Sequence, residues 1–454
     1  MKNLIKLLLL SAFIILSVSD SIAQLTFKSE FRSRAEARYG YRSIPDTSKD
    51  PAFFVTQRTR FGFNYKKEQF EMQVIVQDAR VWGDQSIYSS TSLSGDLASI
   101  DLKEGWLNID LNQSVSMKIG RQEWVVDDER LFSKRDWPTT GLSYDGLLLN
   151  YKLKKFQTTT ALSWNNKDEN VFGNDYRYFT TSYLFDTNTM TIKTQMKEVP
   201  GKIQTLNFLH FKSELSAKIN ISGIFVLSGW QKTGSPKGLL LKETAGTFFS
   251  YKSKNLLTEL SFYYQFGKSS ENKNVSAWCA TASLSNSLGN FKFGAGIDYL
   301  SGNDAQNTSA SYVNTEHLFD LLYGNRHRYY GHLDYFSNLD KGTRKGGLID
   351  TYLKIGYSKN KKHDISADVH YFFLQNNVYN IANTEILQKE LGLETDLYYT
   401  LNISKTANLK CGYSFYLITD SMSDLQGLSN SVSAFPQWFW LSISFKPSVL
   451  LTEN

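Results

Sequence analysis

Arginine and lysine residues that could bind anions recur in the first part of the chain, many of them separated by a single residue. Arginine keeps its charge at physiological pH, and its planar guanidinium group binds a carboxylate through two parallel hydrogen bonds. The cationic residues of this kind are Arg32, Arg34, Arg38, Arg58, Arg60, Arg80, Lys118 and Arg121. The acidic residues between them are Glu30, Glu36, Asp78, Glu104 and Glu123. This composition indicates either a site for anionic solutes or a network of ion pairs that braces the protein.

Residue patterns typical of catalysis are missing from the sequence. The six histidines are scattered, and no Cys/His group has the spacing of a zinc site. The sequence contains no G-x-S-x-G, no P-loop and no G-x-G-x-x-G placed between a strand and a helix. We therefore expect no enzyme activity, no metal and no cofactor. A hydrolase whose serine and histidine converge from distant segments stays open as an alternative.

The elements that carry the charged residues are indicated by a two-residue alternation. From Leu25 to Tyr39 every charged residue occupies an even position, and the odd positions hold apolar or small residues. Successive side chains of a β-strand point to opposite faces, so a strand here places all of these charges on one face. Phe27, Phe31, Ala35 and Tyr39 also have helical spacing, so this stretch alone does not decide between helix and strand.

Repetition of the alternation along the chain favours strands. Further alternating segments begin near Phe53, Phe70, Ile100, Val115, Leu142, Phe156, Ile203, Ala217, Thr247, Leu256, Ser276, Asn290, Leu348, His363, Leu391, Leu409 and Gln437. Short turns connect many of them, and counting gives about 18 strands, an even number as expected for a bacterial outer-membrane barrel. The sequence therefore predicts an all-β fold, a transmembrane antiparallel β-barrel.

The N-terminus predicts secretion. Lys2 and Lys6 precede an apolar stretch from Leu7 to Val18, and small residues precede Gln24, which is the pattern of a secretory signal peptide. We expect residues 1–23 to be removed and residues 24–454 to form one outer-membrane barrel domain. After the signal, no apolar run approaches the ~20 residues that a membrane helix needs.

Composition is consistent with a barrel in the bacterial outer membrane. The chain has 26 Tyr, 30 Phe and 9 Trp but only 41% hydrophobic residues, which fits strands with one face toward lipid and the other toward water. An array of extracellular β-sandwiches shares much of this composition. Since lipid cannot satisfy an open sheet edge, a membrane sheet must close. The basic pI of about 8.9 suggests nucleic acid, but secretion makes an anionic solute or a lipid headgroup the better partner. Cys279 and Cys411 are expected to be small apolar residues in strands rather than a disulfide.

Longer polar segments predict the loops. These segments cover 84–97, 127–140, 165–202, 269–274, 302–347 and 376–390. The segment 302–347 is too long for an ordinary turn, so we expect it to have a function, for example folding into the barrel and constricting the pore.

Several short motifs together resemble the alginate-export family of outer-membrane porins. The central ones are Gly120-Arg121-Gln122-Glu123, Asp128-Glu129-Arg130-Leu131, Arg135-Asp136-Trp137 and Ser143-Tyr144-Asp145-Gly146. Similar later features are Phe319-Asp320-Leu321-Leu322-Tyr323 with His327, Gly331 and Asp334, then Gly392-Leu393-Glu394-Thr395-Asp396 and Gly412-Tyr413-Ser414. Their order and spacing across the chain carry the resemblance.

The resemblance implies an 18-stranded barrel that conducts an acidic saccharide or a polyuronate such as alginate through a constriction lined by arginine and lysine. Carried over to this sequence, it implies that the constriction is lined by Arg58, Arg80, Arg121 and Arg130 and organised by Asp78, Glu123 and Asp128. Expected partners are outer-membrane lipids, a small anionic solute and periplasmic export or uptake proteins. The alternatives are an outer-membrane lipid hydrolase and a closed barrel with a structural or adhesive role.

Overall fold

The computed structural model describes residues 23–46, 48–83, 100–166, 169, 171–173, 175–186, 191–199, 201–428 and 434–452. The predicted signal peptide, apart from Ala23, and the predicted loop at 84–97 lie outside the described residues.

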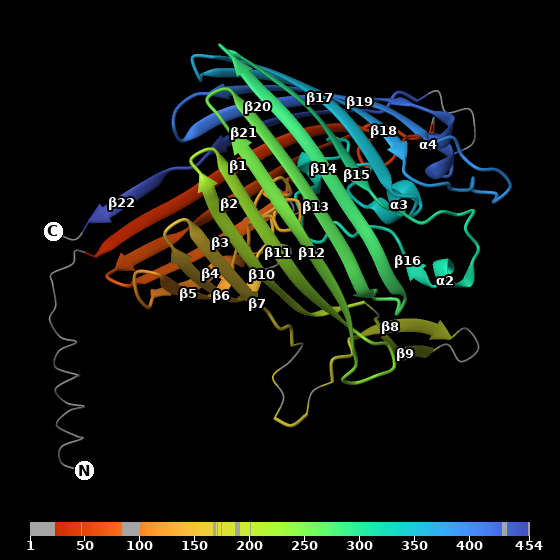
Figure 1. The fold of residues 1–454 in the computed structure, drawn as a ribbon, viewed down its shortest axis with the longest axis horizontal. Helices are drawn as coiled ribbons and strands as arrows, with labels where there is room; N and C mark the ends of the chain where they lie inside the picture. Colours follow the sequence, from red (N-terminus) through yellow and green to blue (C-terminus); the bar gives the residue numbers. More distant parts are fainter. Residues whose placement is uncertain are drawn as a thin grey trace.

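Eighteen antiparallel strands of the described chain close into a barrel, so the predicted fold class is confirmed (Figure 1). Each strand pairs with its neighbours along the chain, and β1 closes the ring by pairing with β21, where Phe31 lies opposite Phe445. The barrel strands are β1 (Gln24–Tyr39), β2 (Ala52–Lys67), β3 (Phe70–Val81), β4 (Ile100–Asp110), β5 (Val115–Gln122), β6 (Tyr144–Leu153), β7 (Phe156–Leu162), β10 (Ile203–Ser216), β11 (Ile219–Gln231), β12 (Leu239–Lys252), β13 (Leu256–Lys268), β14 (Asn274–Leu288), β15 (Phe291–Leu300), β17 (Leu348–Lys359), β18 (His363–Leu374), β19 (Glu390–Asn402), β20 (Ala407–Ile418) and β21 (Gln437–Phe445).

The remaining elements are short and are not strands of the closed ring. β8 (Phe179–Asp186) and β9 (Thr191–Glu198) form a separate hairpin within the predicted loop 165–202. β16 (Thr315–Glu316) pairs with β14, and β22 (Ser448–Thr452) continues along β1 beyond the end of β21. The helical turns are α2 (Ala310–Val313), η2 (Arg326–Arg328), α3 (Leu339–Thr343) and α4 (Asp420–Leu425). Among the described residues, no helix is both long enough and apolar enough to span a bilayer.

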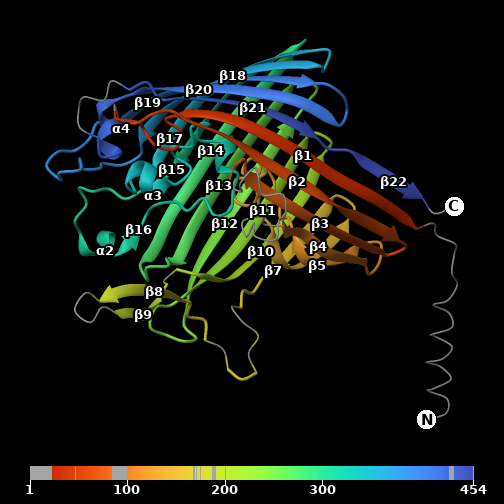
Figure 2. The same ribbon diagram turned by 180° about the vertical axis from the view of Figure 1, so that it is seen from behind.

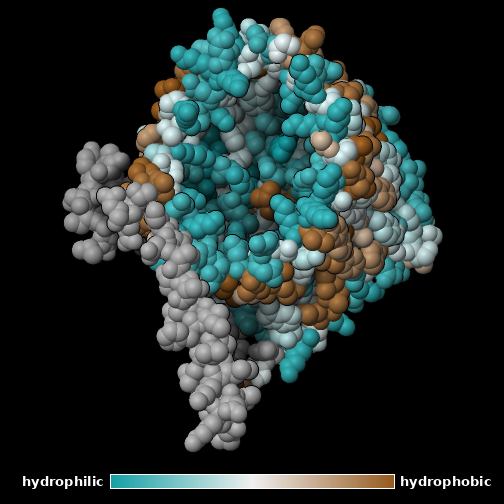
Figure 3. Space-filling view, turned by 60° about the vertical axis from the view of Figure 1, so that its left-hand side comes forward, coloured by the Kyte–Doolittle hydropathy of each residue, from teal (hydrophilic) through white to brown (hydrophobic). Residues whose placement is uncertain are grey.

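The two faces of the wall differ as the alternation predicts. Phe31 and Phe61 are 39% and 50% exposed, whereas Glu30 and Arg58, on the opposite face of the same strands, are 9% and 0% exposed. Figure 3 looks into the end of the barrel where β22 lies and shows a hollow with a hydrophilic lining and apolar residues on the outer wall. On β1 and β2, therefore, Phe31 and Phe61 face lipid, and Glu30 and Arg58 face the interior.

The two ends of the barrel also differ. Short turns lie at the end where β1 begins and β22 ends, and the long connections lie at the opposite end (Figures 1 and 2).

Both cysteines are free, and they lie on opposite faces of the wall, Cys279 buried on β14 and Cys411 half-buried on β20.

Phe262, in the middle of β13, tests the assignment of the outer face. Its side chain is 47% exposed, and an arginine near the bilayer midplane of a barrel costs roughly 2–4 kcal/mol. We expect Phe262→Arg to lower the free energy of unfolding by that amount, measured by denaturant titration in lipid vesicles. Phe262→Leu keeps an apolar group at this position and is expected to change it by less than about 1 kcal/mol; equal stability of the two variants would contradict a lipid-facing position.

Candidate functional site

Two connections fold into the barrel and occupy part of its interior. The first is the 123–143 segment between β5 and β6, and the second is the 317–347 segment between β15 and β17. Several of their apolar residues, such as Phe132 and Phe336, are fully buried. The two segments also contact each other, because the rings of Trp137 and His327 stack with centroids 4.4 Å apart. Together they narrow the route through the barrel.

Guanidinium groups of β1 hold the 123–143 segment by its backbone. Arg32 donates hydrogen bonds to the carbonyl oxygens of Asp136, Trp137 and Pro138 at 2.7, 3.2 and 3.1 Å. Arg34 donates to the Trp137 carbonyl at 2.9 Å, and its guanidinium carbon lies 4.1 Å from the centroid of the Trp137 ring. Backbone carbonyls in a turn have no ladder partners, so the arginines satisfy groups that would otherwise be buried without hydrogen bonds.

Arg58 and Arg60 of β2 add ion pairs to this contact. Arg58, fully buried, binds the Glu30 carboxylate and lies 2.9 Å from Oδ1 of Asp136. Arg60 lies 3.4 Å from the same oxygen and donates to the Thr140 carbonyl at 2.9 Å. Burial alone would raise the pKa of Asp136, but Arg58, Lys446, Arg32 and Arg60 outweigh it and hold the pKa below its usual range. Asp136 is therefore ionised throughout the physiological range.

Lys103 reaches the same segment because of a β-bulge in β4. The pairing with β3 shifts register between Ile75 and Val76, which leaves Lys103 without an opposing residue and turns its side chain inward. Its Nζ donates to the Leu142 carbonyl and the Ser143 hydroxyl at 2.5 and 2.9 Å and lies 3.3 Å from Glu123. Glu123, one of the predicted organising residues, is thus part of this inward cluster.

Arg130 anchors the other side of the 123–143 segment. It forms a two-pronged ion pair with Asp298 of β15, with N–O distances of 2.7 and 2.8 Å, and lies 3.0 Å from Asp128. Burial is the largest influence on Asp128 and raises its pKa although Arg130 opposes it. Burial would lower the pKa of Arg130, but Asp298 and the other negative groups keep it well above its ordinary value. Arg130 and Asp128 therefore form a buried structural network.

The 317–347 segment is held by its own set of polar contacts. Asp334 accepts a hydrogen bond from the Tyr41 hydroxyl at 2.5 Å and lies 2.8 Å from Nδ1 of His327. Burial would raise the pKa of Asp334, but His327, Tyr41 and Arg42 lower it. The backbone N–H of Leu333 donates to Glu394 of β19 at 2.7 Å. Two motifs noted separately in the sequence, one with Asp334 and one with Glu394, thus meet at one turn.

The structure divides the predicted site residues into three groups. Arg32, Arg34, Arg58 and Arg60 converge with Glu123 around residues 136–143, and Arg130 and Asp128 lie together near β15. Arg80, Asp78 and Arg121 do not join either group.

Arg80, Asp78 and Arg121 were expected to point into the barrel, but the strand register places them on the outer face of the wall. Arg80 lies opposite Gln57, on the face opposite to that of Arg58, and is paired with Asp78 at 2.6 Å. Arg121 shares the outward face of Ile119 and pairs with Asp145 at 2.8 Å. Arg121 is three residues from Lys118, and an odd separation in a regular strand reverses the face.

Sequence reasoning missed two cations of the inward cluster. Lys103 depends on a bulge that alternation does not reveal. Lys446, the residue after β21, lies 3.2 Å from Glu30 and 3.6 Å from Asp136. Its position directly after the terminal aromatic residue Phe445 is the one signal that could have drawn attention to it.

The histidines do not form a serine–histidine pair in the part of the chain that the structure describes. His210 and Ser222 both bind Asp127, at 3.1 and 2.7 Å, so the serine hydroxyl donates to the carboxylate. His370 binds Asp350 and His317 binds the Ser276 carbonyl. His210 and His370 therefore each have a carboxylate partner, and His317 has a backbone carbonyl partner.

Comparisons with known proteins agree with this architecture. Residues 21–176 match the model of the alginate export family, which confirms the resemblance over that part of the chain. Similar solved structures include Pseudomonas aeruginosa OccK9 (OpdG), 9% identical over 94% of this chain and 98% of that chain, with a TM-score of 0.57. A BenF-like porin from Pseudomonas fluorescens Pf-5 is 14% identical over 95% of this chain and 100% of that chain, with a TM-score of 0.56.

A third similar structure is that of Pseudomonas aeruginosa OpdK with vanillate, 9% identical over 94% of this chain and 99% of that chain, with a TM-score of 0.55. At these identities the likeness shows the fold. A search of curated proteins gives no match.

Arg58 tests the anchoring of the 123–143 segment. Its replacement leaves Glu30 and Asp136 with fewer partners in a buried position, and breaking a buried ion pair costs about 3 kcal/mol or more. We expect Arg58→Ala to lower the stability of the fold and to expose the segment to trypsin at Lys134, followed by mass spectrometry of the fragments. Arg177→Ala removes an exposed pair with Asp175 and serves as the control; the same cleavage rate in both variants would refute the anchoring role.

His332 makes the 317–347 segment sensitive to acid. Burial, followed by the nearby positive charges of His327, Lys354 and His370, holds the pKa of His332 well below its ordinary value of about 6.5. The unfolded chain binds the proton more readily than the folded segment does. The folded segment therefore has its full stability above pH ~6.5, where both forms are neutral, and it loses stability as the pH falls below that value. At pH 5.5 we expect a loss of about 1 kcal/mol relative to pH 7.5, measured by proteolysis of the segment. In His332→Asn the difference between the two pH values should shrink, and a difference of unchanged size would assign it to other groups.

Proposed function

Because the protein is an outer-membrane β-barrel with the porin fold, we propose that it is a passive channel for small anionic solutes, in particular acidic saccharides. The observation that carries the proposal is a surplus of positive charge beside the inward segments. Seven cations, Arg32, Arg34, Arg38, Arg58, Arg60, Lys103 and Lys446, are in contact with the 123–143 segment or with the acids around it. Four carboxylates, Glu30, Glu36, Glu123 and Asp136, pair with them, so three positive charges are in excess.

An excess of this kind favours anions because it replaces part of the hydration that an anion loses in a narrow passage. The low dielectric constant of the surrounding wall strengthens the effect. Most guanidinium groups of the cluster are already bound to carbonyls or carboxylates. A solute would therefore be attracted mainly by the electrostatic field of these groups and would form few direct hydrogen bonds with them. Conduction requires binding weak enough for release, and a partly neutralised cluster meets that requirement.

Size and family add support for a saccharide. A barrel of 18 strands is wide enough to leave an aqueous channel, and the inward segments reduce its bore. The matching family is described by alginate export, and alginate is a polymer of sugar carboxylates. The similar porin OpdK was solved with vanillate, whose name denotes a carboxylate. Both support a carboxylate as the charged group of the solute.

Arg38 and Lys446 can be replaced to test the proposal while the main anchors of the 123–143 segment are kept. Arg38 pairs with Glu36, which lies outside the segment. When Lys446 is replaced, Glu30 and Asp136 still pair with Arg58. We expect the wild type to form channels that prefer chloride to potassium in planar bilayers and that are blocked by oligouronates. In Arg38→Gln with Lys446→Gln the surplus falls from three charges to one, so the permeability ratio should move toward unity and the block should weaken.

Lys254→Gln with Lys361→Gln removes two equal charges from exposed turns and provides the matched control. Channels without anion preference in the wild type, or with the same preference in the lumen variant, would remove the basis of the proposal.

A further inference from the structure

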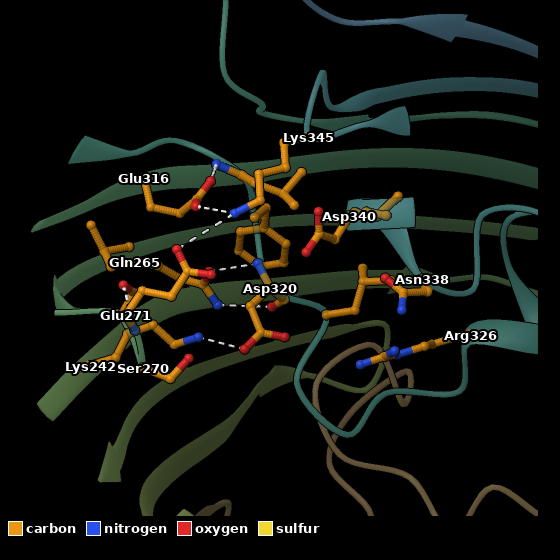
Figure 4. A pocket seen from close by; sticks show the side chains of 16 residues that line it. Lys242, Gln265, Ser270, Glu271, Glu316, Asp320, Arg326, Asn338, Asp340 and Lys345 are labelled. Carbon is orange, nitrogen blue, oxygen red and sulfur yellow. Dashed lines mark hydrogen bonds and ion pairs between the residues drawn. The ribbon is translucent and has the colours of Figure 1, made fainter. Parts of the chain in front are cut away.

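A cavity of about 350 Å³ lies at the end of the barrel with the long connections (Figure 4). One wall comes from β12, β13 and the turn after β13, including Gln265 and Glu271, and the other comes from the 317–347 segment, including Arg326 and Asp340. None of the residues that line it belongs to the arginine cluster of β1 and β2. Its volume is at the lower end of the range for small-molecule sites. The cavity is therefore a separate place where a solute could be held.

Two ion pairs in the cavity wall are already complete. Lys242 lies 2.5 Å from Asp320, whose other carboxylate oxygen accepts the backbone N–H of Leu322. Lys345 lies 3.0 Å from Glu316, whose other oxygen accepts from Asn303 at 2.8 Å. These groups maintain the shape of the wall, as the dashed contacts in Figure 4 show for both pairs.

Three other charged groups have hydrogen-bonding capacity left. Glu271 is 60% exposed at its side chain, and its nearest cations, Lys273 and Lys345, are 3.9 and 4.0 Å away. The exposed carboxylate of Asp340, in the first turn of α3, has no hydrogen bond or ion pair within the described residues. The two terminal nitrogens of Arg326 each donate one hydrogen bond, to the carbonyl oxygens of Ser337 and Leu322, so each retains a second N–H group. The cavity thus offers one acceptor from each wall and a donor from the 317–347 segment.

This combination matches hydroxyl groups best. A hydroxyl donates one hydrogen bond and accepts others, so neighbouring hydroxyls can donate to Glu271 or Asp340 and accept from Arg326. A ligand carboxylate would be repelled by the two acids, and a ligand ammonium would be repelled by Arg326 and Lys345. The apolar side chains of Leu318, Leu321 and Leu339 also line the cavity and can pack against the C–H groups of a ring.

We propose that this cavity binds a neutral, polyhydroxylated sugar ring through its hydroxyls. The inference rests on the proposed saccharide transport, and it assigns recognition of a sugar ring and recognition of a negative charge to two separate places in the barrel. An uncharged sugar residue of an acidic saccharide is recognised at the mouth, and the carboxylate of another residue of the same saccharide is recognised deeper in the lumen by the β1–β2 cluster.

The full mature chain in detergent tests the cavity by isothermal titration with glucose, galactose and mannose, with glucuronate as the acidic comparison. We expect saturable binding of at least one hexose and weaker binding of glucuronate, because Glu271 and Asp340 repel its carboxylate. Glu271→Ala with Asp340→Ala removes both charged acceptors and should weaken hexose binding roughly tenfold, the effect of one to two kcal/mol from a charged hydrogen bond. Glu385→Ala, an exposed acid on the connection between β18 and β19, should bind as the wild type does.

Absence of saturable binding for all three hexoses, or equal binding by the double variant, overturns the inference. Binding of dextran without binding of free hexoses also overturns it, since the site would then serve a surface polysaccharide. Anion preference in bilayers depends on the β1–β2 cluster and is measured separately. Retained anion preference without hexose binding therefore refutes the cavity alone, and hexose binding without anion preference refutes the proposed channel alone.

Discussion

The structure depends on the contact between the inward arginines of β1 and β2 and the backbone of the 123–143 segment. A closed barrel of 18 strands is too wide for the side chains of its wall to fill, so inward connections must be held there by polar groups. Unpaired backbone carbonyls inside a barrel are costly, and so are unpaired guanidinium groups. Each supplies the partner that the other lacks. This mutual requirement explains why the arginines are numerous and why the segment turns back at Asp136 to Thr140.

The same contact determines what the interior can offer to a solute. Arg32 donates its hydrogen bonds to carbonyl oxygens, which are neutral, and Arg34 shares the single carboxylate of Glu36 with Arg38, so positive charge remains in excess here. Arg130 differs, because Asp298 and Asp128 neutralise it completely. The wall between β15 and β19 contributes further buried acids, including Asp350 and Glu394. Positive charge is therefore concentrated along β1 and β2, and the acidic part of the wall holds the opposite side of the inward segments.

Sequence reasoning captured the features that depend on local alternation. Phe439, Leu441 and Ile443 face lipid because they are two residues apart, and the start of nearly every strand could be read in this way. It failed where register or long-range contact decides. Lys103 required a bulge, and the Arg130–Asp298 pair joins residues 168 positions apart. The faces of Arg80 and Arg121 follow from alternation with Phe70 and Lys118, so for these two residues the parity was misassigned. The strand β22 was missed because five residues carry too little periodicity.

The position of β22 has a consequence for the order in which the protein can be completed. Residues Gln24–Lys28 of β1 have β2 on one side, and their other neighbour is Ser448–Thr452, almost the last stretch of the described chain. The hydrogen bonds on this side of Gln24–Lys28 can therefore form only when Ser448–Thr452 is in place. Completion of this edge therefore requires both Gln24–Lys28 and Ser448–Thr452. In a chain shortened after Phe445, the first residues of β1 would keep β2 as their one strand neighbour, at the end of the barrel that is seen open in Figure 3.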